Sequence, residues 1–175
     1  IGTVWQQAVP FFGTLKGGVN MSQIRADRLT FSYDGSIEPV FENASFTLDT
    51  DWKLGLIGRN GKGKTTFLRL LTGELSGSGT LTKSVPVAYF PYLVTSEQMK
   101  QTAADFAEEL RENCEQWRVI CELSELHEDA EVLYRPFETL SLGQRTKVLL
   151  AILFSGENDF LLIDEPTNHL DAQAR

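Results

Sequence analysis

The stretch "GRNGKGKT" (Gly58 to Thr65) constrains the fold more than any other feature, because it fits the phosphate-binding pattern G-x-x-x-x-G-K-[ST]. The apolar run "KLGLIG" leads into it and "KTTFLRLLTG" follows it, which predicts a strand, a glycine-rich loop and a helix. Glycines let backbone N–H groups curl around phosphates, and the helix N-terminus adds partial positive charge. The alternative, a glycine-rich turn with a solvated lysine, does not require this strand-to-helix context. The motif therefore predicts a nucleotide site in an α/β protein.

The loop assigns separate roles to its polar residues. Lys64 is expected to reach the β- and γ-phosphates, and Thr65 to offer its hydroxyl to Mg²⁺. The predicted nucleotide-binding residues are Gly58, Arg59, Asn60, Gly61, Lys62, Gly63, Lys64, Thr65 and Thr66.

Two adjacent carboxylates end the apolar run "FLLIDE", which we expect to form a buried, parallel-type strand. Asp164 is predicted to hold Mg²⁺ opposite the phosphate loop, and Glu165 to act as the base for the attacking water. Neighbouring acids at a strand end are costly unless a cation or a reacting water uses them. The alternative interpretation is a pair of solvated acids, and the presence of the phosphate loop argues against it.

Periodicity predicts the remaining elements. Half-buried strands are expected around Leu29, Phe31 and Tyr33, and around Phe46 and Leu48, and another in "VPVAYF". The stretch 96–131 is helical and acidic in pattern, and "LSLGQRTKVLLAILF" begins an amphipathic helix. In the acidic stretch, one helix side is predicted to contain Phe106, Leu110, Trp117 and Cys121. Strands alternating with helices indicate an α/β core with a helical insert between Tyr92 and Leu140.

Composition narrows the class of protein. The chain has 175 residues, 42% of them hydrophobic, so it can bury a core, but no apolar run approaches the roughly 18–20 residues of a membrane span. A net charge of -8 argues against non-specific binding of nucleic acid, although local basic patches stay possible. Cys114 and Cys121, seven residues apart, are predicted to share one helix face as reduced core residues of a cytoplasmic protein.

Four motifs together carry a family resemblance. "GRNGKGKT", "LSLGQ" (Leu140 to Gln144), "LLIDEP" and "NHLD" (Asn168 to Asp171) resemble those of an ABC-type ATPase domain over Met21 to Arg175. "PTNHLD" and "LSLGQRTKV" resemble the ABC-F subfamily, whose members mostly act on ribosomes. The stretch "DWKLGLIGRNGKGKTTFLRLL" is most similar to the antibiotic-resistance group that protects ribosomes. The resemblance implies a P-loop NTPase fold of ABC type, with N-terminal antiparallel β strands and a helical subdomain at about 93–155.

The resemblance also implies roles for single residues. ATP with Mg²⁺ is the expected ligand of the loop, and Tyr33 is expected to stack on adenine, although alternation alone leaves a core role open. Asp171 would link two ATP sites. A signature segment would touch the γ-phosphate held by an opposite ATPase domain, and consists of Ser141, Leu142, Gly143 and Gln144.

Two residues depart from the family pattern. Leu142 replaces a glycine, and Tyr92 replaces a glutamine that helps hold Mg²⁺ and water, so we expect slow hydrolysis.

The sequence, together with the resemblance, also predicts how the chain is organised. Residues 1–20 are expected to be a translated leader or linker, since Lys16-Gly17-Gly18 can be encoded by a ribosome-binding sequence before Met21; a true N-terminal extension is the alternative. Residues 21–175 would form a partial ABC domain, truncated after the Asp164 strand and the Asp171 loop and nearly inactive alone. The expected function is ATP hydrolysis with a second ATPase domain, acting on the ribosome in the cytoplasm, without direct membrane insertion. The alternatives are the ATP-binding subunit of an ABC transporter and, more weakly, a DNA-repair or structural ATPase.

Overall fold

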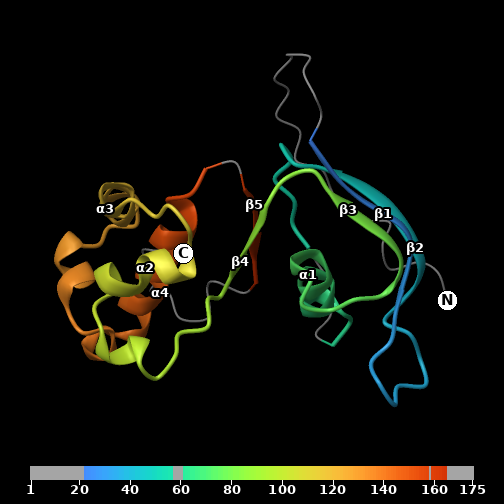
Figure 1. Ribbon diagram of the computed structural model, residues 1–175, viewed down its shortest axis with the longest axis horizontal. Helices are drawn as coiled ribbons and strands as arrows, with labels where there is room; N and C mark the ends of the chain where they lie inside the picture. The colour runs from blue at the N-terminus through green and yellow to red at the C-terminus, as the bar shows by residue number, and fades with distance from the viewer. Residues whose placement is uncertain (1–21, 57–60, 158, 165–175) are drawn as a thin grey trace. The chain divides into compact units, whose positions relative to one another are not determined.

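The computed structural model describes residues 22–56, 61–157 and 159–164, and divides between Val87 and Ala88 into two compact units. The β unit (residues 22–87) contains β1 (Gln23–Phe31), β2 (Phe41–Asp49), α1 (Lys64–Thr72), β3 (Ser78–Lys83) and the first residue of β4 (Val87–Phe90). The helical unit (residues 88–164) continues with η1 (Gln98–Lys100), α2 (Ala103–Leu110), α3 (Gln116–Glu125), η2 (Ala130–Tyr134), η3 (Phe137–Thr139), α4 (Leu142–Phe154) and β5 (Phe160–Ile163). Each unit is taken by itself (Figure 1).

The β unit is built on a three-stranded antiparallel sheet in the order β2-β1-β3. On the central strand, Ile24 and Ala26 are buried, and burial then resumes at Leu29 and Phe31. The phase of the alternation changes because a bulge intervenes, with Arg28 in the left-handed region at φ 52°. The two predicted half-buried strands are confirmed, except that β1 ends at Phe31, before the predicted strand residue Tyr33.

Helix α1 packs on this sheet through a small apolar cluster that Leu70 shares with Ala26, Leu29 and Phe41. Gly73 ends the helix in the left-handed region at φ 91°, and its N–H donates to the carbonyl of Arg69 at 3.1 Å. The predicted helix and its glycine end are confirmed.

Two parts of the β unit differ from the sequence prediction. Strand β3 was not predicted, because its residues are mostly polar and exposed, as is common for an edge strand. The predicted strand "KLGLIG" is wrong where the structure describes it, since Lys53–Leu56 belongs to no β-ladder. An apolar run becomes a strand only when distant backbone pairs with it, and local composition does not supply that partner.

The helical unit is organised around α4, which was predicted to be amphipathic. Every residue from Thr146 to Leu153 is buried, because α2, α3 and η2 all contact this helix. Phe106 of α2 and Phe137 of η3 complete the core with an edge-to-face contact, their ring centroids 5.3 Å apart. The helix is confirmed, but its amphipathic character is wrong.

The acidic stretch forms two helices, separated at Asn113, which lies at φ 57°. The predicted common face is therefore wrong: Val119 and Leu123 are the buried residues of α3, whereas Trp117 and Cys121 are exposed. Residues two positions from a buried one lie about 200° around a helix, on its outer side.

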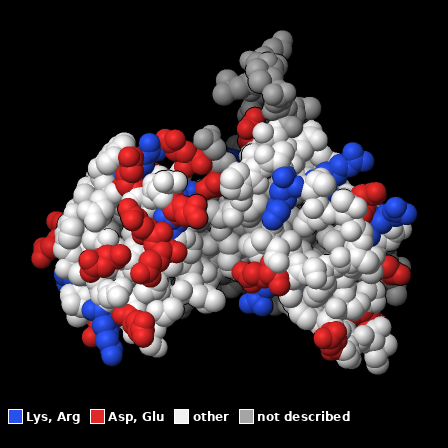
Figure 2. Space-filling view, viewed as in Figure 1, with Lys and Arg blue, Asp and Glu red and all other residues white. Residues whose placement is uncertain are grey.

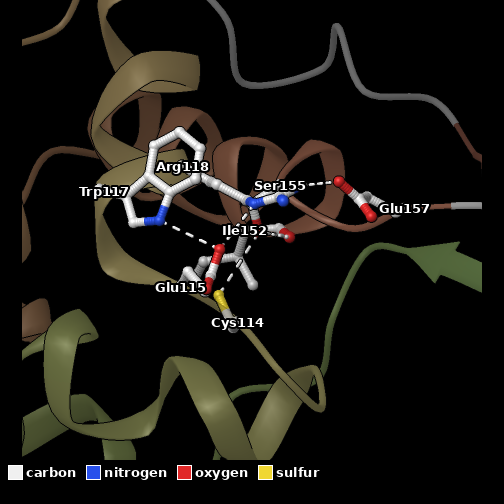
Figure 3. Close-up of polar contacts among 7 residues, drawn as sticks. All are labelled: Cys114, Glu115, Trp117, Arg118, Ile152, Ser155 and Glu157. Carbon is white, nitrogen blue, oxygen red and sulfur yellow. Dashed lines mark hydrogen bonds and ion pairs between the residues drawn. The ribbon is translucent and has the colours of Figure 1, made fainter.

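The two cysteines also lie in different settings. Cys114 precedes α3 and is buried, with Sγ 3.4 Å from Ser155 Oγ (Figure 3), so its prediction as a reduced core residue is confirmed. Cys121 is free but exposed, so its core placement is wrong.

An ion-pair bridge on the surface holds α3 to the segment after α4. Arg118 Nε donates to Glu115 Oε2 at 2.8 Å, and the other end of its guanidinium pairs with Glu157 (Figure 3). The same guanidinium lies 5.0 Å from the centroid of the Trp117 ring. The Trp117 ring thus packs against the guanidinium of this ion-pair bridge, which explains why a large aromatic residue is found outside the core.

Strands β4 and β5 pair to form a two-stranded sheet within the chain as described. Only Leu162 of β5 is buried, while Leu161 and Ile163 are 37% and 38% exposed. The predicted strand is confirmed, but its burial on both faces is wrong: Leu161 and Ile163 lie on the face opposite Leu162, and the described residues cover that face only in part.

A buried ion pair joins the end of α2 to the start of β5. Arg111 is 8% exposed and pairs with Asp159, directly before the strand. Gly156 makes room for this pair, since a Cβ atom there would collide with the Arg111 guanidinium. Any side chain at position 156 must therefore displace the arginine.

Gly156→Ala is expected to lower the free energy of unfolding of the helical unit by about 2–4 kcal/mol, because it separates a buried ion pair. Thermal denaturation followed by circular dichroism measures this loss. Gly55→Ala is the matched control, because no heavy atom lies within 4 Å of a Cβ built there. An equal loss in the two variants would contradict the packing role of Gly156.

Candidate phosphate-binding and signature sites

The described part of the phosphate loop ends in a glycine that no other residue can replace without strain. Gly63 lies at φ 85° immediately before α1, in a region that side chains disfavour. A Cβ atom on it would also come within 2.5 Å of Val40 Cγ1. Backbone conformation and space thus both require glycine here. Gly58, Arg59 and Asn60 lie outside the described residues.

The start of α1 presents the remaining loop residues at a helix N-terminus. Lys64 is its first residue and half-buried, Thr65 is exposed, and Thr66 is buried. The first turn of this helix contains no acidic residue. Helix N–H groups and a lysine at one end favour an anion, as the sequence motif requires.

Tyr33 lies next to the same helix turn. Its hydroxyl is 2.9 Å from Thr66 Oγ1, and its ring stands edge-on to Phe31 with centroids 5.0 Å apart. The side chain is 44% exposed, so the alternative of a core residue does not hold. The structure therefore brings Tyr33 to the helix that begins with Lys64, with part of its surface open to a ligand.

Asp164 directly follows β5 in the helical unit. Its backbone N–H donates to the carbonyl of Phe90 at 3.1 Å, and the Tyr89 hydroxyl donates to Oδ2 at 3.4 Å. A carboxylate oxygen is a ligand that Mg²⁺ prefers, so Asp164 is able to supply one. Glu165 and Asp171 lie outside the described residues.

Tyr92 lies in the helical unit. It packs against the helical core, and burial raises the pKa of its phenol, while the neighbouring Arg111 opposes this in part. The side chain is therefore a neutral phenol near the Arg111–Asp159 pair. Such a group has no amide oxygen to offer, consistent with the expected departure from the family pattern.

The signature segment (Ser141–Gln144) forms the first turn of α4. Ser141 caps the helix: its Oγ accepts from the N–H of Gln144 at 3.2 Å, and its own N–H donates to Gln144 Oε1 at 3.1 Å. Leu142 is 60% exposed, so its bulk extends outward from this turn. The structure thus brings Ser141 and Gln144 into contact.

Sequence reasoning missed two residues at these sites. Val40 forms the wall behind Gly63, and Glu128 accepts from the amide of Gln144 at 3.1 Å. Nothing local marks Val40. An acidic partner such as Glu128 could have been predicted, because Lys147 falls within the apolar run of α4 and a buried lysine requires an anionic partner.

Comparison with known proteins assigns the family. Residues 41–168 match the family described as ABC transporter. The chain belongs to this family. The resemblance to an ABC-type ATPase domain is thereby confirmed, and the relatives described next confirm its similarity to the ABC-F group.

Three relatives illustrate the match. The ribosome protection protein VmlR of Bacillus subtilis is 36% identical over 78% of this chain and 25% of its own length. The ABC transporter ATP-binding protein ARB1 of Saccharomyces cerevisiae is 33% identical over 83% of this chain and 25% of its own. ABC transporter F family member 3 of Arabidopsis thaliana is 32% identical over 83% of this chain and 21% of its own. The chain thus spans about a quarter of these relatives or less.

Solved structures confirm the fold class. A putative metal-chelate type ABC transporter in an inward-facing conformation has a TM-score of 0.68 and 24% identity, covering 89% of this chain and 64% of its own. A bacterial Atm1-family ABC exporter with ATP bound has a TM-score of 0.67 and 18% identity, over 90% of this chain and 31% of its own. In the described ranges of the ABC domain, no helix combines the length and hydropathy that a bilayer crossing needs.

Lys64→Ala is expected to weaken ATP binding by about ten- to a hundredfold, because a charge-assisted contact to the phosphates is lost. Calorimetric titration with Mg²⁺ measures the affinity. Lys53→Ala is the matched control, since it removes an exposed lysine that lies outside the loop, and we expect a change within about threefold. Equal affinities for the Lys64→Ala variant and the unaltered chain would refute the assignment.

Proposed function

We propose that this ABC domain is the first ATP-binding domain of an ABC-F-type ATPase that hydrolyses ATP and acts on the ribosome. The observation that carries the proposal is the 36% identity to a ribosome protection protein over 78% of the chain. Phosphate-loop, Asp164 and signature residues, all required for this activity, support it. An action that protects ribosomes from an antibiotic is part of the same proposal.

In this proposal the β unit binds the nucleotide. Tyr33 stacks on adenine, while the loop from Gly58 to Thr66 surrounds the phosphates with backbone N–H groups. Lys64 neutralises charge on the β- and γ-phosphates. Thr65 would offer its hydroxyl and Asp164 its carboxylate to Mg²⁺, and the ion would supply positive charge to offset the charge of the phosphate oxygens.

Hydrolysis transfers the γ-phosphoryl group to water. Glu165 accepts the proton of the attacking water, the bond to the γ-phosphorus forms, and the bond to the bridging oxygen of ADP breaks. Tyr92 stands where a glutamine is expected to orient the attacking water. It does not take over that role, because its phenol lies beside Arg111 in the helical unit. We therefore expect hydrolysis to be slow.

A second ATPase domain completes the proposed site. Its bound ATP would meet the signature segment of this domain, with Asp171 linking the two sites. Residues 21–175 would then be part of a longer protein and residues 1–20 a leader or linker. The domain itself would lie in the cytoplasm without inserting into a membrane.

Under this proposal the protein contacts the ribosome although part of the surface of this domain is acidic. Acidic side chains gather over the helical unit on the face that Figure 2 shows, and the chain carries a net charge of -8. Such a face repels RNA phosphates. Contacts with ribosomal RNA are therefore expected from other faces or from other parts of the full-length protein.

Glu165→Gln in the full-length protein should abolish most hydrolysis while ATP binding survives, because the amide keeps the size of the side chain but cannot accept a proton. If the ribosome prefers the ATP-bound, closed state, the variant should stay bound to it. Co-sedimentation with ribosomes in the presence of ATP measures this, and we expect more of the variant than of wild type in the pellet.

Glu157→Gln provides the matched control, since this exposed carboxylate pairs with Arg118 on the surface. It should behave as wild type. A Glu165→Gln protein that sediments free of ribosomes but associates with a membrane permease would support the transporter subunit instead.

A further inference from the structure

Glu128 lies between the end of α3 and the first turn of α4. Its side chain is 15% exposed, and its two carboxylate oxygens have different partners. Oε1 accepts from Gln144 Nε2 at 3.1 Å, and Oε2 accepts from Lys147 Nζ, also at 3.1 Å. One carboxylate thus connects two side chains of the helix that begins with the signature segment.

The backbone of Glu128 is fixed before its side chain reaches α4. The N–H of Glu128 donates to the carbonyl of Leu123 at 2.9 Å, and that of His127 to the carbonyl of Ser124 at 3.1 Å. These two bonds, with His127 at φ 53°, are those of a Schellman motif at the end of α3. The carboxylate is therefore held from a rigid helix end.

Glu128 also determines which way the Gln144 amide points. The oxygen of this amide accepts from the N–H of Ser141, and its nitrogen donates to Glu128. A reversed amide would direct an N–H group at the Ser141 N–H and an oxygen at a carboxylate, so both contacts would become repulsive. Only one orientation satisfies both neighbours, and it is the one that closes the capping box.

Lys147 balances the charge of this arrangement. Its side chain is 8% exposed, and Nζ also lies 3.4 Å from the carbonyl of His127. The ammonium offsets the carboxylate near a turn that, under the proposed function, meets the γ-phosphate of another domain. Without it, Glu128 would repel that phosphate.

We propose that Glu128 is a positioning residue for ATP hydrolysis, which acts by fixing Gln144 and thereby the first turn of α4. The inference rests on the proposed function, because the signature segment matters only if it meets ATP. ATP is first bound by the phosphate loop of its own domain, so loss of Glu128 affects the later closure and hydrolysis. Nucleotide affinity of the open protein stays unchanged.

The test compares Glu128→Ala, Gln144→Ala and the double variant in the full-length protein. We expect each single variant to lower kcat about tenfold, with the dissociation constant of a fluorescent ATP analogue within about twofold of wild type. Because Glu128 acts through Gln144, the double variant should have the kcat of Gln144→Ala within about twofold. Glu125→Ala, which removes an exposed carboxylate from the last residue of α3, should match wild type.

Three results overturn the inference. They are an unchanged kcat in folded Glu128→Ala, a further tenfold loss in the double variant, and a loss of nucleotide affinity equal to the loss of kcat. If Glu128→Ala does not fold, Glu128→Leu, which fills more of the space but offers no acceptor oxygen, is judged with and without Gln144→Ala by the same comparison. A wild-type protein that neither binds nor hydrolyses ATP refutes the proposed function and this inference with it, whereas an active wild type with an unaffected Glu128→Ala refutes the inference alone.

Discussion

The buried pair of Arg111 and Asp159 is the interaction on which the helical unit most depends. It connects the end of α2 to the residue before β5, so it joins helical core and strand across 48 positions of the sequence. A buried guanidinium needs its counter-ion, because an unpaired charge in the interior is strongly destabilising. Gly156 leaves the space, and Tyr92 brings its phenol to the same guanidinium. Tyr92, which we expect to depart from the family pattern, thus contacts the ion pair directly before β5.

Local sequence patterns predicted the elements that depend on side-chain alternation and on glycine positions. Alternating side chains identified β1 and β2, and the loop glycines together with Gly73 marked the ends of α1. These local patterns do not predict which distant segments pair in a sheet. Lys53–Leu56 has the composition of a buried strand but pairs with no described backbone, and one face of β5 is covered only in part by the described residues.

The candidate sites were predictable as motifs, while the residues that support them were not. The phosphate loop, Asp164 and the signature segment follow from residue types at fixed spacing. Glu128 and Val40 have no motif, since each contributes through contacts that only the folded chain brings about. The sequence also concealed the break at Asn113, and therefore the exposure of Trp117. A helical period carried across that break assigns the wrong face to every residue after it.

The different settings of the two cysteines have a practical consequence. Cys121 offers a thiol at the surface of α3, whereas the sulfur of Cys114 is enclosed beside Ser155. A maleimide reagent should therefore modify one position without any engineered substitution. A dye attached there would sit on the outer side of α3, opposite the residues that pack into the helical core. The fluorescence anisotropy of that dye would then report how rigidly α3 is held on the helical core.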